Sequence, residues 1–328
     1  MKKLLIGLIS LVSMMATPHG TAASLTPGQP LELAGTQGKF DFIKIDAMRR
    51  RLLACHTGNG SLDVIDIDST KLIKSVATGA AQGVAIDEKN GRYFVSCSKP
   101  PKLVIVDSTK LEVIGEVPLP GPADIVAYHP QLNRAFVCND EKPELWVIDP
   151  EAKKIVTTLA LPGAGMEDLG FNASGTFLFQ NLKEASELVK IDPAKEKIMT
   201  SWPTAPAEKP HGLAMVDAAD AVLIAGGTGK LVLLSLSSGQ VLASADIAQR
   251  VDEIAYDPGL QRVYGASGLG MISVVSVGKN ELIALDSIPS SPGAHSIAVD
   301  PKTHTVWIAF TKEKQAFVQP FAAIASGD

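Results

Sequence analysis

A run of apolar residues that ends in one polar anchor residue occurs seven times along this chain. Successive anchors are 40 to 45 residues apart. Each unit holds four short segments with alternating β-branched and aromatic residues, separated by turn signals such as Lys89-Asn90-Gly91. One four-stranded unit cannot bury both of its faces, so the repeats predict radial packing into an all-β, seven-bladed β-propeller. The anchors are Asp46, Asp87, His129, Asn172, Asp217, Asp257 and Asp300.

Two further sequence features fit a propeller: the way in which the last blade is completed, and the small residues near the central axis. The seventh unit has three clear strands and then only a few residues, so its outermost strand is missing. The segment Gln29–Gly35 resembles the fourth strands of other units, and we predict that this N-terminal segment closes the last blade and covers its open edge. Small residues lie two or three positions before six of the anchors, where inner strands converge: Ala85, Ala127, Gly170, Ala214, Ala255 and Ala298.

Two recurring residue types have structural explanations. Aspartates end the third strand of four units, where each can accept hydrogen bonds from nearby backbone N–H groups and fix a turn; they are Asp68, Asp107, Asp149 and Asp192. The three cysteines, Cys55, Cys97 and Cys138, fall near the ends of second strands in three successive units. We expect these cysteines to fill the sheets as small buried residues, since equivalent positions of neighbouring blades are too far apart for a disulfide.

The first 23 residues indicate export. Lys2 and Lys3 precede an apolar run and then small residues up to Ala23, which is the layout of a secretory signal peptide. An uncleaved anchor is the alternative. We therefore predict a periplasmic or secreted bacterial protein in which residues 24–328 form one propeller domain without a transmembrane segment. The net charge of −5 makes nucleic acid an improbable partner, because nucleic-acid binding needs a basic face.

The repeat also resembles a known family. The stretch GVAIDEKNGRYFVSCSKPPKLVIVDSTKLEVIGEVPLPG, from Gly83 to Gly121, is similar to the repeat of the YVTN-type, surface-layer-like β-propellers. The resemblance implies an exported seven-bladed wheel. The same superfamily includes the heavy subunit of methylamine dehydrogenase, the haem d1 domain of nitrite reductase and propeller lactonases, so the fold leaves the function open.

Propellers bind ligands at one mouth of the central channel, and one residue of each unit is expected there. Five or six positions before the anchors this ring is polar in every unit: Asp41, Gln82, Asp124, Glu167, His211, Asp252 and His295. His211, Asp252 and His295 come from three successive units and could hold a divalent metal ion, because imidazole and carboxylate are suitable ligands. The alternative is that these histidines are ordinary strand starts whose rings bond to loop backbone.

Three functions fit the sequence. The first is a binding module that recognises an unknown protein, peptide or small ligand at the channel mouth, and the absence of a catalytic motif favours it. The second is a metal-dependent hydrolase such as a lactonase, with Glu167 or Asp124 as general base. The third is an accessory subunit of a periplasmic redox system, as the superfamily suggests. Of these, the sequence favours a protein that is not an enzyme, and we predict no cofactor, with a divalent metal ion as the open alternative.

Overall fold

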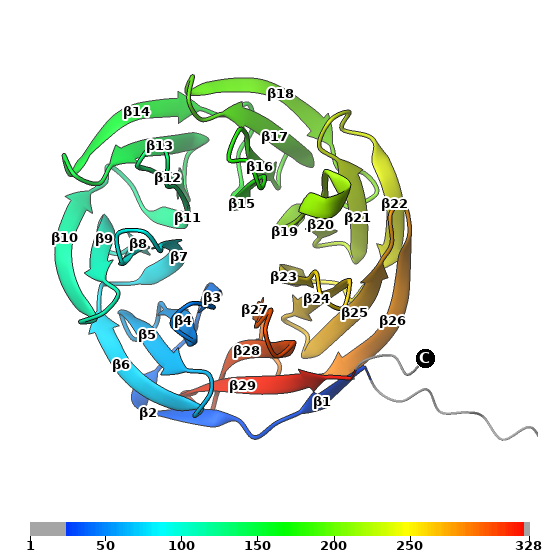
Figure 1. Ribbon diagram of the computed structural model, residues 1–328, viewed down its shortest axis with the longest axis horizontal. Coiled ribbons are helices and arrows are strands. Elements are labelled where there is room, and N and C mark those ends of the chain that lie inside the picture. The colour runs from blue at the N-terminus through cyan, green and yellow to red at the C-terminus, as the bar shows by residue number, and fades with distance from the viewer. Residues whose placement is uncertain (1–23, 325–328) are drawn as a thin grey trace, which may run out of the picture.

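Seven antiparallel sheets surround a central axis in the computed structural model, which describes residues 24–324 (Figure 1). Six sheets have four strands each, and the seventh has five because the N-terminal segment joins it. The predicted all-β, seven-bladed propeller is therefore confirmed. The predicted signal peptide, residues 1–23, lies outside the described residues. Within them, no helix is long and apolar enough to cross a membrane.

The strands follow one another outward from the axis in each blade, and blades are numbered here in chain order. The innermost strands are β3 (Ile43–Asp46), β7 (Ala81–Asp87), β11 (Ala123–His129), β15 (Met166–Phe171), β19 (Pro210–Val216), β23 (Val251–Asp257) and β27 (Ser296–Val299). The second strands are β4 (Arg51–His56), β8 (Arg92–Ser98), β12 (Arg134–Asn139), β16 (Leu178–Leu182), β20 (Ala221–Gly226), β24 (Arg262–Ser267) and β28 (Thr305–Lys312). The third strands are β5 (Ser61–Asp66), β9 (Pro101–Asp107), β13 (Glu144–Asp149), β17 (Glu187–Asp192), β21 (Lys230–Ser235), β25 (Met271–Val277) and β29 (Gln315–Ala323). The outermost strands are β6 (Lys71–Ala77), β10 (Glu112–Pro118), β14 (Lys154–Ala160), β18 (Lys197–Pro203), β22 (Val241–Asp246) and β26 (Leu282–Pro289), with β1 (Leu25–Pro27) and β2 (Leu31–Gln37) in blade 7. A single 3-10 turn, η1 (Asp217–Ala219), joins β19 to β20.

The hydrophobic core lies between the blades. Seven clusters of buried residues each combine side chains from two neighbouring sheets, including one cluster between blade 7 and blade 1. Each sheet therefore buries both faces against its neighbours, as the repeat length requires. Cys55, Cys97 and Cys138 belong to these clusters as free, buried thiols, in agreement with the expected packing role.

The N-terminal segment closes the wheel as predicted. Strand β2 pairs with β29, with Leu31 opposite Val318, and β1 continues along the same edge with Leu25 opposite Ala323. Figure 1 shows β1 and β2 beside β29 on the outside of the last blade. Leu25 and Leu33 are each only 1% exposed, so the added strands supply core as well as hydrogen bonds.

The small residues near the axis face the channel in most blades. Ala85, Ala127, Gly170, Ala255 and Ala298 all line the cavity around the axis. In blade 5 Leu213 and Met215 line the cavity, whereas Ala214 is only partly buried and packs against the cluster between blades 5 and 6. Ala214 keeps the register of its counterparts, since it pairs with Leu223 as Ala85 pairs with Phe94, so the extra residue of the fifth unit follows it in the chain.

The expected turn aspartates are confirmed in three blades and shifted in the first. Asp107, Asp149 and Asp192 accept hydrogen bonds from backbone N–H groups two and three residues on. In blade 1 the third strand ends at Asp66, which accepts the N–H of Ser69. The prediction for Asp68 was wrong, because this residue lies two positions past the strand and pairs instead with Arg50 at 2.8 Å.

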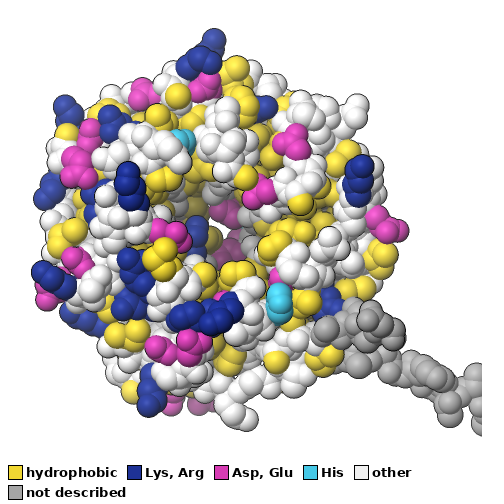
Figure 2. Space-filling model, in the orientation of Figure 1, with side chains coloured by type: hydrophobic (Ala, Val, Ile, Leu, Met, Phe, Trp, Pro, Cys, Tyr) yellow, Lys and Arg dark blue, Asp and Glu magenta, His cyan; other side chains and the backbone are white. Residues whose placement is uncertain are grey.

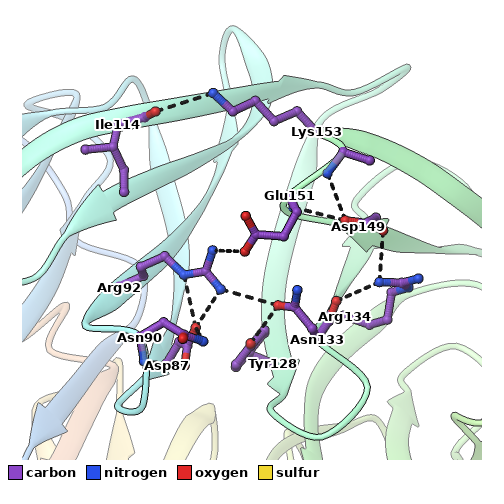
Figure 3. Close-up of polar contacts among 11 residues, drawn as sticks. Asp87, Asn90, Arg92, Ile114, Tyr128, Asn133, Arg134, Asp149, Glu151 and Lys153 are labelled. Atoms are coloured by element: carbon purple, nitrogen blue, oxygen red, sulfur yellow. Dashed lines mark hydrogen bonds and ion pairs between the residues drawn. The ribbon is translucent and has the colours of Figure 1, made fainter.

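Four anchor aspartates tie neighbouring blades together at the ends of the inner strands. Asp46 accepts a hydrogen bond from the Tyr93 hydroxyl of blade 2 at 2.7 Å, and Asp257 lies 2.7 Å from the His304 ring of blade 7. Asp300 binds both terminal nitrogens of Arg50 in blade 1 at 2.7 Å. The fourth, Asp87, acts through Arg92, which reaches Glu151 of blade 3 (Figure 3).

Asp300 gives a first testable prediction. Its side chain is 1% exposed, and burial alone would raise its pKa, but hydrogen bonds from Arg50 and Thr303 outweigh burial and lower the pKa from 3.8 to about 2. A depressed pKa contributes stability above the unfolded-state pKa, and this contribution, on the order of 2 kcal/mol, is lost as the pH falls from 3.8 to about 2. We expect the stability gap between the native chain and Asp300→Asn to narrow over that pH window in denaturant titrations. Asp246→Asn, which removes an 83% exposed carboxylate, should change the free energy of unfolding by less than about 1 kcal/mol.

Candidate functional site: an acidic channel mouth

The starts of the inner strands meet in a polar cavity of about 220 Å³ at one end of the channel. Six of the seven predicted mouth residues line it: Asp41, Gln82, Asp124, Glu167, His211 and Asp252. The seventh, His295, lines a neighbouring cavity of about 400 Å³ together with His211 and Asp252. Six of the predicted ring residues therefore line one cavity, and His295 lies beside it.

Two glycines allow the inner strands to approach each other closely beside this ring. A Cβ on Gly83, which follows Gln82, would lie 2.9 Å from the Ile125 Cα of blade 3. A Cβ on Gly212, which follows His211, would lie 2.9 Å from the Asp252 carbonyl oxygen of blade 6. Because these atoms are backbone atoms that cannot yield easily, the glycines set how near neighbouring mouth residues come.

The mouth contains more acidic than basic groups. Sequence reasoning missed three further acids that line the cavity, Asp140, Asp168 and Glu253, and one base, Lys39. Burial is the main cause that raises the pKa of Asp41 to about 7; Lys39 lowers it, and Asp252, Glu167 and Asp140 raise it further. Burial also raises the pKa of Asp124 well above its usual range. The carboxylates thus repel one another in a confined space, which favours binding of a cation.

Gln82 also lacks a partner in this cavity. Its residue surface is 8% exposed, and among the described residues no group donates a hydrogen bond to its Oε1 atom. A buried acceptor without a donor is unfavourable by about 1–3 kcal/mol. A ligand that donates a hydrogen bond in the mouth would relieve that penalty.

Three of the mouth residues form one close group. His211 Nε2 lies 3.8 Å from Glu167 Oε1 and 4.0 Å from Asp252 Oδ1, and one ligand atom from each residue falls within 4.8 Å of the others. The predicted metal set shares His211 and Asp252 with this group, but Glu167 stands where His295 was expected. Lys183, in the loop after β16, donates a hydrogen bond to Glu167 Oε1.

Lys183 and Asp140 were detectable in principle. Both follow a second strand, and the loops from second to third strands are where a propeller mouth is built. Their signal is only this position in the unit, since neither belongs to a repeated motif. Asp168 and Glu253 each follow a predicted ring residue directly, so strand alternation argued against their facing the cavity.

The opposite end of the channel differs in character. A cavity of about 960 Å³ there is lined mainly by apolar side chains, and the basic residue Lys44 also lines it. Phe42, Ile125 and Asp168 line both this cavity and the acidic mouth. Burial lowers the pKa of Lys44, while Asp168 acts to raise it. Figure 2 shows the hollow at the centre of the wheel, with charged side chains inside and hydrophobic ones around it.

Comparison with solved structures finds the same fold in otherwise different proteins. A chain of the Kuenenia stuttgartiensis hydrazine synthase matches with a TM-score of 0.75 and 15% identity, covering 90% of this chain and 99% of that one. A chain of a mitotic checkpoint complex matches with a TM-score of 0.79 and 12% identity over 99% of both chains. U3-55K matches with a TM-score of 0.75 and 10% identity, covering 89% and 98%. At these identities the likeness establishes the fold alone.

Comparison with protein-family models and with curated proteins gave no match. The class that the fold and the site define is a seven-bladed β-propeller with an acidic channel mouth.

Proposed function

We propose that this chain is an exported binding module whose acidic mouth receives a positively charged group of a protein or peptide partner. The observation that carries the proposal is the convergence of carboxylates from blades 1, 3, 4 and 6 on one cavity. The YVTN-type resemblance and the N-terminal sequence support export. One of the similar structures is a chain of a mitotic checkpoint complex, which supports a propeller that works by association.

The size of the mouth favours one side chain over a whole small molecule. Ligand pockets for drug-sized molecules occupy about 300–1,000 Å³, whereas the acidic cavity has about 220 Å³. A lysine or arginine side chain supplies the positive charge that the ring lacks and N–H donors for the unpaired Gln82 oxygen. The rest of the partner would then rest on the surrounding loops.

Neutralising two carboxylates of the mouth tests this proposal. We expect Asp41→Asn/Asp124→Asn to weaken binding of a fluorescein-labelled oligolysine peptide by about 10-fold or more, since each lost charge contact is worth about 1 kcal/mol at such a site. Fluorescence anisotropy at about pH 9 measures it, because burial raises the pKa of Asp41 to about 7 and that of Asp124 well above its usual range, so an alkaline buffer favours ionisation of both.

The matched control removes the same charge elsewhere. Glu116→Gln/Asp246→Asn alters two exposed carboxylates of outermost strands, each paired with a lysine. The control should bind the peptide within about twofold of the native chain, because distant surface charges are screened. Equal weakening in both double variants would mean that only net charge matters, and the mouth proposal would be rejected.

A further inference from the structure

The close group at the mouth has the chemistry of a metal site. We propose that Glu167, His211 and Asp252 bind a divalent transition-metal ion, zinc in the first instance. This inference rests on the proposed function in that it refines the same mouth: the metal occupies the side formed by blades 4, 5 and 6, while Asp41 and Asp124 on blades 1 and 3 remain for the partner.

The hydrogen bond at the far side of the His211 ring sets its tautomer. His211 Nδ1 lies 2.7 Å from the Lys209 carbonyl oxygen, an acceptor, so Nδ1 carries the proton. In the neutral ring the Nε2 lone pair therefore points toward two carboxylates, at 3.8 and 4.0 Å. Lys183 already donates to Glu167 Oε1, so the uncompensated repulsion is between the Nε2 lone pair and the Asp252 carboxylate, and a metal cation among the three atoms removes it. Metal-bound histidines commonly donate their other ring N–H to a backbone carbonyl in this way.

The surroundings hold the first two ligands in place. Lys183 donates a hydrogen bond to Glu167 Oε1, and Gln180 Nε2 donates to the Glu167 carbonyl at 2.7 Å. Asn181 Nδ2 donates to the His211 carbonyl at 2.8 Å, which fixes the backbone of the imidazole ligand. Asp252 is less constrained by packing, since its side chain is 43% exposed. Bonds of about 2.0–2.2 Å to zinc place ligand atoms about 3.3 Å apart. His211 Nε2 lies 3.8 Å from Glu167 Oε1 and 4.0 Å from Asp252 Oδ1, so small inward movements of both carboxylates complete the site.

An independent observation also indicates a missing ligand in the same cavity. The Gln82 side chain lines this cavity, and the residue is only 8% exposed. Its Oε1 atom accepts no hydrogen bond from any of the described residues. The donor set of one imidazole and two carboxylates suits zinc or manganese better than calcium, which prefers oxygen ligands alone. Three protein ligands leave a coordination position for water or for a partner group.

Isothermal titration of the purified, tag-free chain with zinc chloride tests the site. We expect one zinc ion per chain, and weakening by about 100-fold or more in His211→Ala and in Asp252→Ala, because each loses a direct ligand. The matched control is His295→Ala, which removes a histidine that lines only the neighbouring cavity and should leave the zinc affinity unchanged. Zinc should also raise the melting temperature of the native chain and of His295→Ala but not of His211→Ala.

Zinc binding that survives His211→Ala, or is lost in His295→Ala, would overturn the assignment to these three residues. Absence of zinc and manganese binding to the native chain would reject the metal site altogether. The oligolysine assay keeps this outcome apart from the proposed function: Asp41→Asn/Asp124→Asn should retain zinc, so peptide binding and metal binding can fail separately.

Discussion

Replacing Arg92 with methionine is expected to destabilise the propeller by about 3–5 kcal/mol, because it leaves a buried carboxylate without its cation. Arg92 Nε and Nη2 bind Asp87 Oδ2 at 3.0 and 2.7 Å, and Nη1 binds Glu151 of blade 3 at 2.6 Å (Figure 3). Burial tends to raise the pKa of Asp87, but Asn90 and Arg92 hold it below its ordinary value. Urea unfolding at neutral pH measures the loss as a lower midpoint with an unchanged slope.

A double variant shows how much of that loss of stability comes from the unpaired Asp87 carboxylate. Asp87→Asn in the Arg92→Met background removes the stranded charge, so the double variant should be less destabilised than the sum of the single changes. The matched control is Lys102→Met, which breaks a 2.7 Å ion pair with the 48% exposed Glu116 and should have an effect below about 1 kcal/mol. Equal losses of stability in Arg92→Met and Lys102→Met would show that the link between blades 2 and 3 contributes no more to the free energy of unfolding than an exposed ion pair does.

Truncating Leu33 in the closing strand should destabilise the wheel by about 2–5 kcal/mol, as for other fully buried leucines. Leu33 is 1% exposed and packs in the cluster between blades 7 and 1 with Phe40, Ile43 and Trp307. Loss of this contact weakens the hold of β2 on β29, so the β29 amides should also exchange hydrogen faster. Thermal unfolding and hydrogen exchange measure the two effects.

A leucine on another outermost strand provides the comparison. Leu285 of β26 is 41% exposed, and Leu285→Ala should cost less than about 1 kcal/mol and leave β29 exchange unchanged. If Leu33→Ala behaves like Leu285→Ala, the N-terminal strands are an accessory to blade 7 rather than its closure. Increased aggregation of Leu33→Ala would accompany true opening, because a freed β29 edge can pair with another chain.

The repeat made most of the architecture predictable. The spacing of the repeat predicted seven blades. Because the seventh unit lacks an outermost strand, the sequence also predicted that Gln29–Gly35 supplies one, and β2 (Leu31–Gln37) pairs with β29 in that position. Fold symmetry then placed one residue of each unit at the same end of the channel. These inferences succeed because alternation and turn residues are encoded within each unit, so they do not depend on contacts between distant side chains.

The details of the site depend on such contacts and were less accessible. Symmetry treated His211 and His295 as equivalents, yet His211 is the second residue of β19 whereas His295 precedes β27. The close approach at Gly212 and the Lys209 carbonyl orient His211 toward Glu167 and Asp252. In blade 1 the third strand ends at Asp66, two residues earlier than the repeat suggested, so Asp66 and not Asp68 fixes the turn.

The two ends of the inner strands carry separate duties. The anchor aspartates, which join one blade to the next, stand where these strands finish, and the acidic ring stands where they begin. Changes to the ring side chains therefore leave the ties made by the anchor aspartates untouched. The same propeller could therefore carry other side chains at the channel mouth, and bind another ligand, with its fold unchanged. This makes it a suitable scaffold for engineering recognition.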